Sequence, residues 1–237
     1  MYAGTLSHSP LAWGRRILDY LRVLPKSEIV YSQIMRSFDR QGFEEVKRRW
    51  YALQAGDNRK QAGALKYLNV PVYLRRNIRL ALRLGLDHLP PQRVLDIGSG
   101  AGYFLLVCRH FGHDPLGMDV ENTLGYDQIF HFFRLRRLIG AVEGRHPLPA
   151  FDTPFDLITA IAFVFDVFPD KSSWTLKEWA YFVDDARSRL NPGGRLFLAA
   201  ATRIGNNPAL QDYLLHAPGF ETQLLSHYEF MLNRRDG

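Results

Sequence analysis

The sequence predicts an α/β protein with a mostly parallel sheet, preceded by a helical N-terminal extension. The first observation is an apolar run from Val94 to Ile97 that enters a glycine-rich turn and then a helical apolar segment, Phe104 to Val107. The second is that later apolar runs alternate with helical segments toward the C-terminus. The third is that 237 residues, 46% of them hydrophobic, suffice for one α/β domain and a smaller attachment.

The turn after the first predicted strand carries three glycines at alternate positions, Gly98, Gly100 and Gly102, two residues after Asp96. Glycine adopts positive φ without strain and lets backbone N–H groups approach a ligand closely. The start of the following helix adds unpaired N–H donors and partial positive charge. The turn is therefore predicted to hold a carboxylate or a phosphate of a cofactor.

A second acid distinguishes between cofactors. Residues 114–120 are predicted to form a strand that ends near Asp119, whose carboxylate can accept hydrogen bonds from both hydroxyls of a ribose. The glycines follow the spacing GxGxG, whereas a dinucleotide-binding turn has GxGxxG. This difference disfavours a dinucleotide.

These motifs resemble those of the class I S-adenosylmethionine-dependent methyltransferases. The acid and glycine turn, the downstream Asp119 and the turn Asn191-Pro192-Gly193-Gly194 occur once each, in the order of that family. The resemblance implies a Rossmann-like methyltransferase sandwich, with a seven-stranded, mostly parallel sheet and a closing antiparallel strand. It implies S-adenosyl-L-methionine as the cofactor and a methyltransferase core at residues 91–237, with residues 1–90 as a lid or substrate-binding extension.

The resemblance also implies roles for single residues. Asp96 and the glycine turn would hold the methionine end of the cofactor, Asp119 the ribose and Val120 the adenine. Glu143 would be the polar residue after the third strand, and Ala160 with Ile161 would border the methyl group at the end of the fourth. The complete set of predicted cofactor-binding residues is Asp96, Ile97, Gly98, Ser99, Gly100, Gly102, Asp119, Val120, Glu143 and Ala160.

The N-terminal segment shows helical periodicity with interruptions expected near Pro25, Gly42, Gly56 and Pro71. Its clearest helix covers residues 72–84. There Leu74, Ile78 and Leu82 recur beside a row formed by Arg75, Arg79 and Arg83, so one face is expected to pack and the other to meet water or an anion.

The elements expected after the second strand are a helix at 124–138, a short third strand at 141–143, a fourth strand within 155–165, a helix opened by the capping box of Thr175 and Glu178, a fifth strand at 195–201, a helix at 209–216 and a closing hairpin around Leu224 and Met231. The aromatic residues after Ala160 are expected to belong to the core, with an apolar substrate pocket as the alternative.

No catalytic residue is predicted. His131, Asp166 and His227 are possible general bases, but isolated residues of these types more often serve as surface or capping groups. Nothing in the sequence has the spacing of metal ligands, so no metal site is expected. Residues 160–163, Ala-Ile-Ala-Phe, differ from the Asn/Asp-Pro-Pro-aromatic motif of enzymes that methylate exocyclic nitrogens, which disfavours that substrate class.

The net charge of +6 is unevenly distributed, since residues 1–90 carry 16 Lys and Arg against 7 Asp and Glu. A small-molecule acceptor is favoured. One alternative is an RNA-directed enzyme whose Arg75, Arg79, Arg83 and residues 47–50 contact phosphates. The other is a cofactor-binding protein without activity.

The single Cys108, the lack of a secretory signal and the lack of a long apolar run lead us to expect a cytoplasmic protein without membrane segments. The oligomeric state is not indicated.

Overall fold

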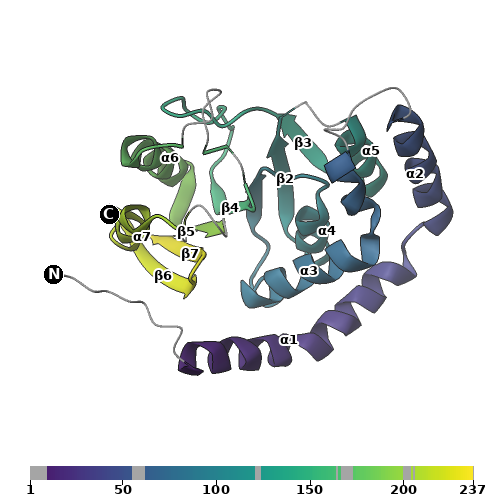
Figure 1. The fold of residues 1–237 in the computed structure, drawn as a ribbon, viewed down its shortest axis with the longest axis horizontal. Helices are drawn as coiled ribbons and strands as arrows, with labels where there is room; N and C mark the ends of the chain where they lie inside the picture. Colours follow the sequence, from purple (N-terminus) through teal and green to yellow (C-terminus); the bar gives the residue numbers. More distant parts are fainter. Residues whose placement is uncertain are drawn as a thin grey trace.

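The fold is centred on a seven-stranded sheet in the order β3-β2-β1-β4-β5-β7-β6 (Figure 1). The computed structural model describes residues 10–54, 62–120, 124–163, 165–166, 173–199, 204 and 206–236. Strands β1 to β5 pair in parallel, whereas β7 is antiparallel to both β5 and β6. The prediction of a mostly parallel sheet with a closing antiparallel strand is therefore confirmed.

The strands are β1 (Arg93–Ile97), β2 (Asp114–Asp119), β3 (Arg136–Ile139), β4 (Phe155–Ile161), β5 (Leu190–Ala199), β6 (Phe220–Ser226) and β7 (Glu229–Arg234). The helices are α1 (Pro10–Arg36), α2 (Arg40–Gln54), the 3-10 helix η1 (Ala62–Leu68), α3 (Val70–Arg83), α4 (Tyr103–His110), α5 (Leu124–Phe133), α6 (Leu176–Ser188) and α7 (Pro208–Leu215).

Alternation along β1 separates two hydrophobic layers. Val94 faces one side of the sheet, where it joins buried residues of α3, α4 and α5. Leu95 and Ile97 face the other side, where they join residues of α6 and α7. Since successive strand residues point to opposite faces, Asp96 lies on the Val94 side, beneath α3 and α4.

The N-terminal helices share the first of these layers. Helix α1 packs on α3, α3 on α4, and α2 on α5 (Figure 1). Trp50 of α2 is 2% exposed and lies over Gly125, where an added Cβ would come within 2.2 Å of the indole ring. The extension and the sheet therefore enclose one continuous core.

Two element boundaries differ from the predictions around β3. The predicted helix at 124–138 is too long, because α5 ends at Phe133 and Arg134 takes a φ of +52°. The third strand is Arg136–Ile139 and not 141–143, since residues 136–139 pair with 116–119 of β2. As an edge strand, β3 accommodates two arginines that the sequence pattern did not associate with a strand.

Further differences concern β5 and the N-terminal helices. Strand β5 begins at Leu190, and Asn191 to Gly194 form a bulge within it rather than a turn before it, with Gly193 at a φ of +68°. Helix α1 continues through Pro25, and Gly42 lies inside α2, so the interruptions expected there are wrong. Pro71 opens α3, as a residue without an N–H can in the first turn. Gly56 lies outside the described residues.

Candidate functional site

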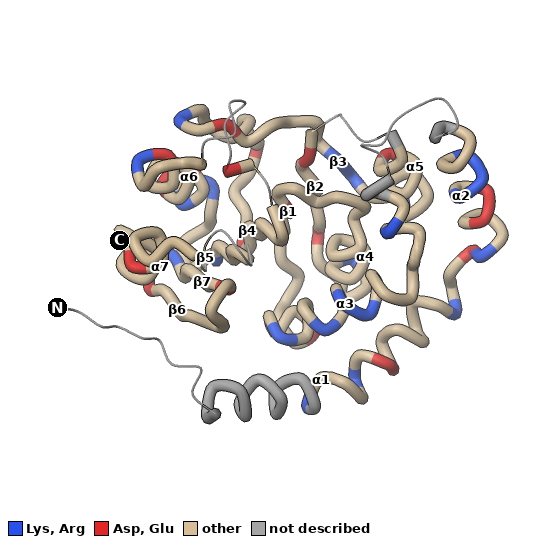
Figure 2. The backbone as a smooth tube through the Cα atoms, in the orientation of Figure 1, with Lys and Arg blue, Asp and Glu red and all other residues tan. Residues whose placement is uncertain are grey.

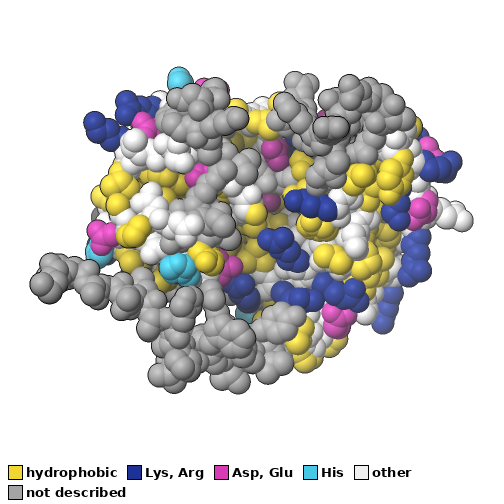
Figure 3. Space-filling model, in the orientation of Figure 1, with side chains coloured by type: hydrophobic (Ala, Val, Ile, Leu, Met, Phe, Trp, Pro, Cys, Tyr) yellow, Lys and Arg dark blue, Asp and Glu magenta, His cyan; other side chains and the backbone are white. Residues whose placement is uncertain are grey.

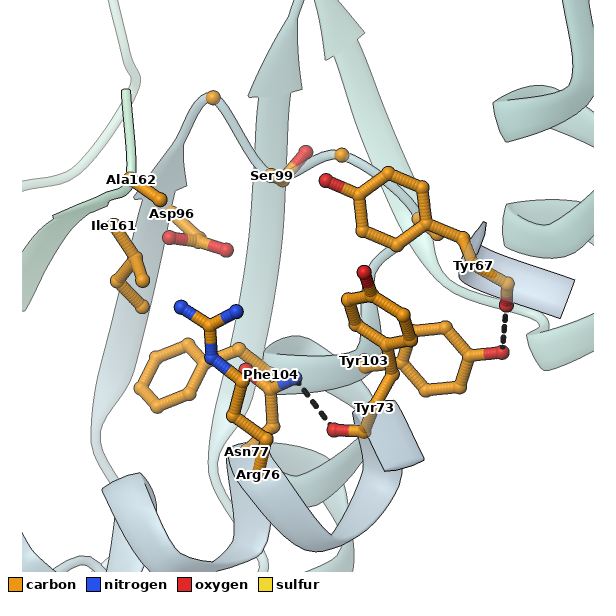
Figure 4. Close-up of a pocket in the computed structure, with 13 residues that line it drawn as sticks. Tyr67, Tyr73, Arg76, Asn77, Asp96, Ser99, Tyr103, Phe104, Ile161 and Ala162 are labelled. Atoms are coloured by element: carbon orange, nitrogen blue, oxygen red, sulfur yellow. Dashed lines mark hydrogen bonds between the residues drawn. The ribbon is translucent and has the colours of Figure 1, made fainter. Parts of the chain in front are cut away.

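A pocket opens at the carboxyl ends of β1 and β4, between the glycine turn and the helices η1 and α3 (Figure 4). Parallel α/β sheets place their ligand sites at this edge. The residues that line it are Tyr67, Tyr73, Arg76, Asn77, Asp96, Gly98, Ser99, Gly100, Ala101, Tyr103, Phe104, Ile161 and Ala162.

Asp96 places a buried carboxyl group in the pocket. It is 3% exposed, and its Oδ1 accepts a hydrogen bond of 2.7 Å from Thr159 Oγ1 on the neighbouring strand β4. Burial raises the pKa of Asp96 to about 7; the bond from Thr159 acts to lower the pKa, and the charge of Asp119 acts to raise it. This carboxyl group therefore titrates near neutral pH, and a cation bound beside it would favour its ionised form.

The glycine turn is tied to β2 by backbone hydrogen bonds. The N–H groups of Gly98 and Ser99 donate to the carbonyl of Met118 at 2.8 and 3.2 Å. The N–H of Gly100 donates to Asp119 Oδ2 at 2.7 Å. Gly98 and Gly100 have φ values of +71° and +53°, which explains why the turn needs glycine at both positions.

Asp119 lies at the end of β2, beside the turn but outside the set of residues that line the pocket. Its Oδ1 accepts a hydrogen bond of 2.8 Å from the N–H of Val120, while its Oδ2 accepts the bond from Gly100. A carboxylate oxygen can accept two hydrogen bonds, so each oxygen keeps capacity for a ligand hydroxyl. The structure thus fixes the orientation of this carboxylate.

The other predicted site residues lie away from the pocket lining. Ile97 and Ala160 are buried and pair with each other across β1 and β4. Gly102 precedes α4, where an added Cβ would come within 2.9 Å of the Phe130 ring, so this glycine permits packing. Glu143 is exposed and lies 3.5 Å from His146. Of the predicted set, the pocket brings together Asp96, Gly98, Ser99 and Gly100.

Helices η1 and α3 supply pocket residues that were not predicted from the sequence, namely Tyr67, Tyr73, Arg76 and Asn77. Figure 4 shows Arg76 reaching from α3 toward Asp96, with the tyrosine rings on the other side of the pocket. Arg76 directly follows Arg75, the first member of the predicted arginine row. A step of one residue rotates a helical side chain by about 100°, so the row of Arg75, Arg79 and Arg83 gave no signal for the position of Arg76.

Tyrosines form the wall beside the glycine turn. The ring centroids of Tyr67 and Tyr73 are 4.6 Å apart, and those of Tyr73 and Tyr103 are 5.8 Å apart. The hydroxyl of Tyr103 donates a hydrogen bond of 2.6 Å to the carbonyl of Tyr67, which ties α4 to η1. Burial raises the pKa of Tyr103, so this hydroxyl stays protonated at neutral pH.

None of the possible general bases lines the pocket. His131 and His227 are exposed, and Asp166 is buried with its carbonyl accepting a hydrogen bond from the Trp174 N–H. The aromatic residues after Ala160 pack against one another in the second hydrophobic layer, as the core interpretation predicts: Phe163, Phe165, Trp174, Trp179 and Phe182.

The basic residues of the N-terminal half include many ion pairs. Arg75 lies 2.8 Å from Glu28 and stacks over Tyr31, and Arg83 pairs with Glu229 of β7. Figure 2 shows both positive and negative residues along α2, while Figure 3 shows Lys and Arg side chains gathered over α3 among hydrophobic ones. In the described segments, there is no cluster of His, Cys, Asp or Glu side chains that could hold a metal ion. None of the described helices is long and apolar enough to cross a bilayer.

The strand order, the acid and glycine turn after β1 and the acid that ends β2 together define a class I S-adenosylmethionine-dependent methyltransferase. The sequence of residues 69–233 matches the family model described as "Methyltransferase domain". The chain belongs to this methyltransferase family.

Similar proteins occur among both curated sequences and solved structures. The malonyl-[acyl-carrier protein] O-methyltransferase of Methylococcus capsulatus is 31% identical in an alignment of 164 positions that covers 63% of this chain and 50% of that protein. This chain therefore matches only half the length of that relative. The S-adenosylmethionine-bound structure of CalS10, an amino pentose methyltransferase from Micromonospora echinaspora, has a TM-score of 0.51 at 17% identity over 68% of this chain and 91% of that one. At this identity the likeness extends to the fold alone.

Proposed function

We propose that this methyltransferase binds the methionine end of S-adenosylmethionine in the pocket beside Asp96 and methylates a small-molecule acceptor there. The observation that carries the proposal is the arrangement at one sheet edge of the buried carboxyl group of Asp96, the glycine turn that follows it and Asp119, which accepts a hydrogen bond from that turn. The proposed domain organisation follows from the pocket wall. Residues 1–90 act as a helical cover that contributes Tyr67, Tyr73 and Arg76, and residues 91–237 form the catalytic core.

The residues around the turn fit the cofactor. Ionised Asp96 would face the methionyl ammonium, and Gly98 and Gly100 leave room because an added Cβ meets no atom closer than 3.7 Å at either position. Asp119 would accept hydrogen bonds from the ribose hydroxyls, with Val120 beside the adenine. Two further residues are proposed to lie farther from the reacting atoms. Glu143 would lie near the adenine amino group, and Ala160 would lie behind Ile161.

When bound, the cofactor supplies a methyl group activated by a positively charged sulfur. The protein then contributes alignment and exclusion of water, and holding two reactants in line is equivalent to an effective concentration of about 10⁵ to 10⁸ M. Ile161 and Ala162 border the pocket at the end of β4, while Tyr67, Tyr73 and Phe104 limit access of water. The described residues that line the pocket include no histidine, so we propose that the acceptor presents an atom that is already deprotonated.

The Methylococcus relative is named for O-methylation of a malonyl group held on a carrier protein. This name supports oxygen as the acceptor atom. It also supports a second form of the substrate, in which the small acceptor is attached to a carrier protein during the reaction.

The proposal is tested by calorimetry with S-adenosylhomocysteine and by a turnover assay with radiolabelled S-adenosylmethionine and a panel of small carboxylic acids, phenols and amines. We expect saturable binding at one site and transfer to an oxygen acceptor. Absence of binding would overturn the proposed site. Binding without transfer to any acceptor would favour the non-catalytic alternative, and RNA affinity that falls steeply with salt would favour the RNA-directed one.

The affinity for S-adenosylhomocysteine should depend on pH because of Asp96. Its pKa in the free protein is about 7, and a neighbouring ammonium lowers the pKa of a carboxyl group. Binding therefore releases a proton, and the affinity rises as the pH increases through this range. Between about pH 6 and pH 8 the expected gain is up to about tenfold.

Calorimetry across this range, repeated in buffers of different ionisation enthalpy, measures both the affinity and the proton release. Asp96→Asn is the matched control and should remove the pH dependence. The role proposed for Asp96 would be wrong if the parent protein and this variant showed the same pH profile.

A further inference from the structure

Arg76 differs from the other arginines of α3. Arg75 pairs with Glu28 at 2.8 Å, Arg83 pairs with Glu229, and Arg79 also has a bonding partner. Within the described part of the chain, Arg76 makes no hydrogen bond or ion pair, although it borders a pocket that also contains Asp96. An arginine that faces a pocket without a protein partner is available to a ligand.

The position of Arg76 restricts what that ligand can be. In Figure 4 its guanidinium group extends from α3 into the space bordered by Asp96, Ile161 and Phe104. Among the described residues that line the pocket, it is the only lysine or arginine. A planar guanidinium binds a carboxylate through two parallel N–H···O hydrogen bonds, a geometry that neutral groups do not match.

The neighbouring groups support this selectivity. Asn77 is held by its own hydrogen bond of 2.8 Å to the carbonyl of Tyr73, and Tyr103 donates to the carbonyl of Tyr67. These polar side chains are therefore engaged within the protein. The positive charge of Arg76, which extends toward the carboxyl group of Asp96, is left as the main feature of this part of the pocket that selects an anion.

We propose that Arg76 binds a carboxylate in this pocket. The inference rests on the proposed function, and two carboxylates could reach the guanidinium group. One is the methionyl carboxylate of the cofactor, whose ammonium would face Asp96. The other belongs to the acceptor, which would then be a carboxylic acid that needs no general base. The chemistry is the same in both cases, and the source is determined by experiment.

The first experiment compares the parent protein, Arg76→Gln and Arg76→Lys by calorimetry with S-adenosylhomocysteine and with its decarboxylated analogue. Arg36→Gln, at an exposed arginine at the end of α1, is the control for loss of charge. If the cofactor is the source, Arg76→Gln weakens S-adenosylhomocysteine binding by about tenfold or more, whereas the decarboxylated analogue binds the parent and Arg76→Gln equally. Arg76→Lys should retain part of the affinity, and Arg36→Gln all of it.

The second experiment titrates malonate, or neutral malonamide, into protein saturated with S-adenosylhomocysteine. If the acceptor is the source, malonate binds the parent and not Arg76→Gln, malonamide binds neither, and S-adenosylhomocysteine affinity is equal in both proteins. The inference is overturned if Arg76→Gln changes neither the S-adenosylhomocysteine affinity nor the binding of malonate. Failure of the parent to bind S-adenosylhomocysteine would instead reject the proposed function itself.

Discussion

Asp119→Ala is expected to reduce the affinity for S-adenosylhomocysteine by about 100-fold or more. Two hydrogen bonds from ribose hydroxyls to a carboxylate contribute roughly 1.5 to 3 kcal/mol each, and the substitution removes both. It also removes the acceptor for the Gly100 N–H, whose bond to Oδ2 is 2.7 Å long, so the glycine turn loses one of its connections to β2. Isothermal titration calorimetry gives the affinity directly.

Two further variants separate these effects. Asp114→Ala lies on the same strand, where Asp114 pairs with Arg136 at the surface, and it should leave the affinity unchanged. Asp119→Asn keeps a side-chain oxygen that can accept from Gly100 but lacks the charge, so its affinity should lie between those of the parent and the alanine variant. An affinity within about twofold of the parent for Asp119→Ala would contradict the proposed ribose contact.

Trp50→Ala is expected to lower the free energy of unfolding by about 3 to 5 kcal/mol. Trp50 is 2% exposed, its ring meets the Tyr126 ring edge-on at 6.2 Å, and it covers Gly125 at the start of α5. Truncation leaves a cavity between α2 and α5. The quantity to measure is the urea dependence of unfolding, monitored by circular dichroism.

Tyr51→Ala is the matched control, because the adjacent Tyr51 is 55% exposed and its removal should change the free energy of unfolding by no more than about 0.5 kcal/mol. Equal stabilities of Trp50→Ala and Tyr51→Ala would mean that α2 is not docked on α5 as described. A selective loss in Trp50→Ala would show that the N-terminal helices stabilise the sheet.

The sequence predicted the centre of the fold well because its signals there are local. An apolar strand, three glycines and an acid lie within a few residues of one another, and the local structure at each position requires that type of residue. Strand β3 was missed for the opposite reason. It has four residues, two of them arginines, and it becomes a strand only because β2 offers an unpaired edge.

The pocket residues from η1 and α3 could not be inferred in the same way. Tyr67 and Arg76 come close to the glycine turn only after α3 has packed on α4, a contact between segments far apart in the sequence. Periodicity identified the buried face of α3 correctly, since Leu74, Ile78 and Leu82 are buried. It did not indicate that the flank carrying Arg76 would face a ligand pocket rather than solvent.

The hydrogen bonds that join the glycine turn to β2 have a consequence for the thermodynamics of cofactor binding. Gly98, Ser99 and Gly100 all donate to the end of β2, so hydrogen bonds within the protein hold the turn in place. Binding then loses little conformational entropy at this segment, and more of the interaction energy remains as affinity. Product would leave a turn that keeps its shape, so successive cycles of exchange would not require the turn to refold.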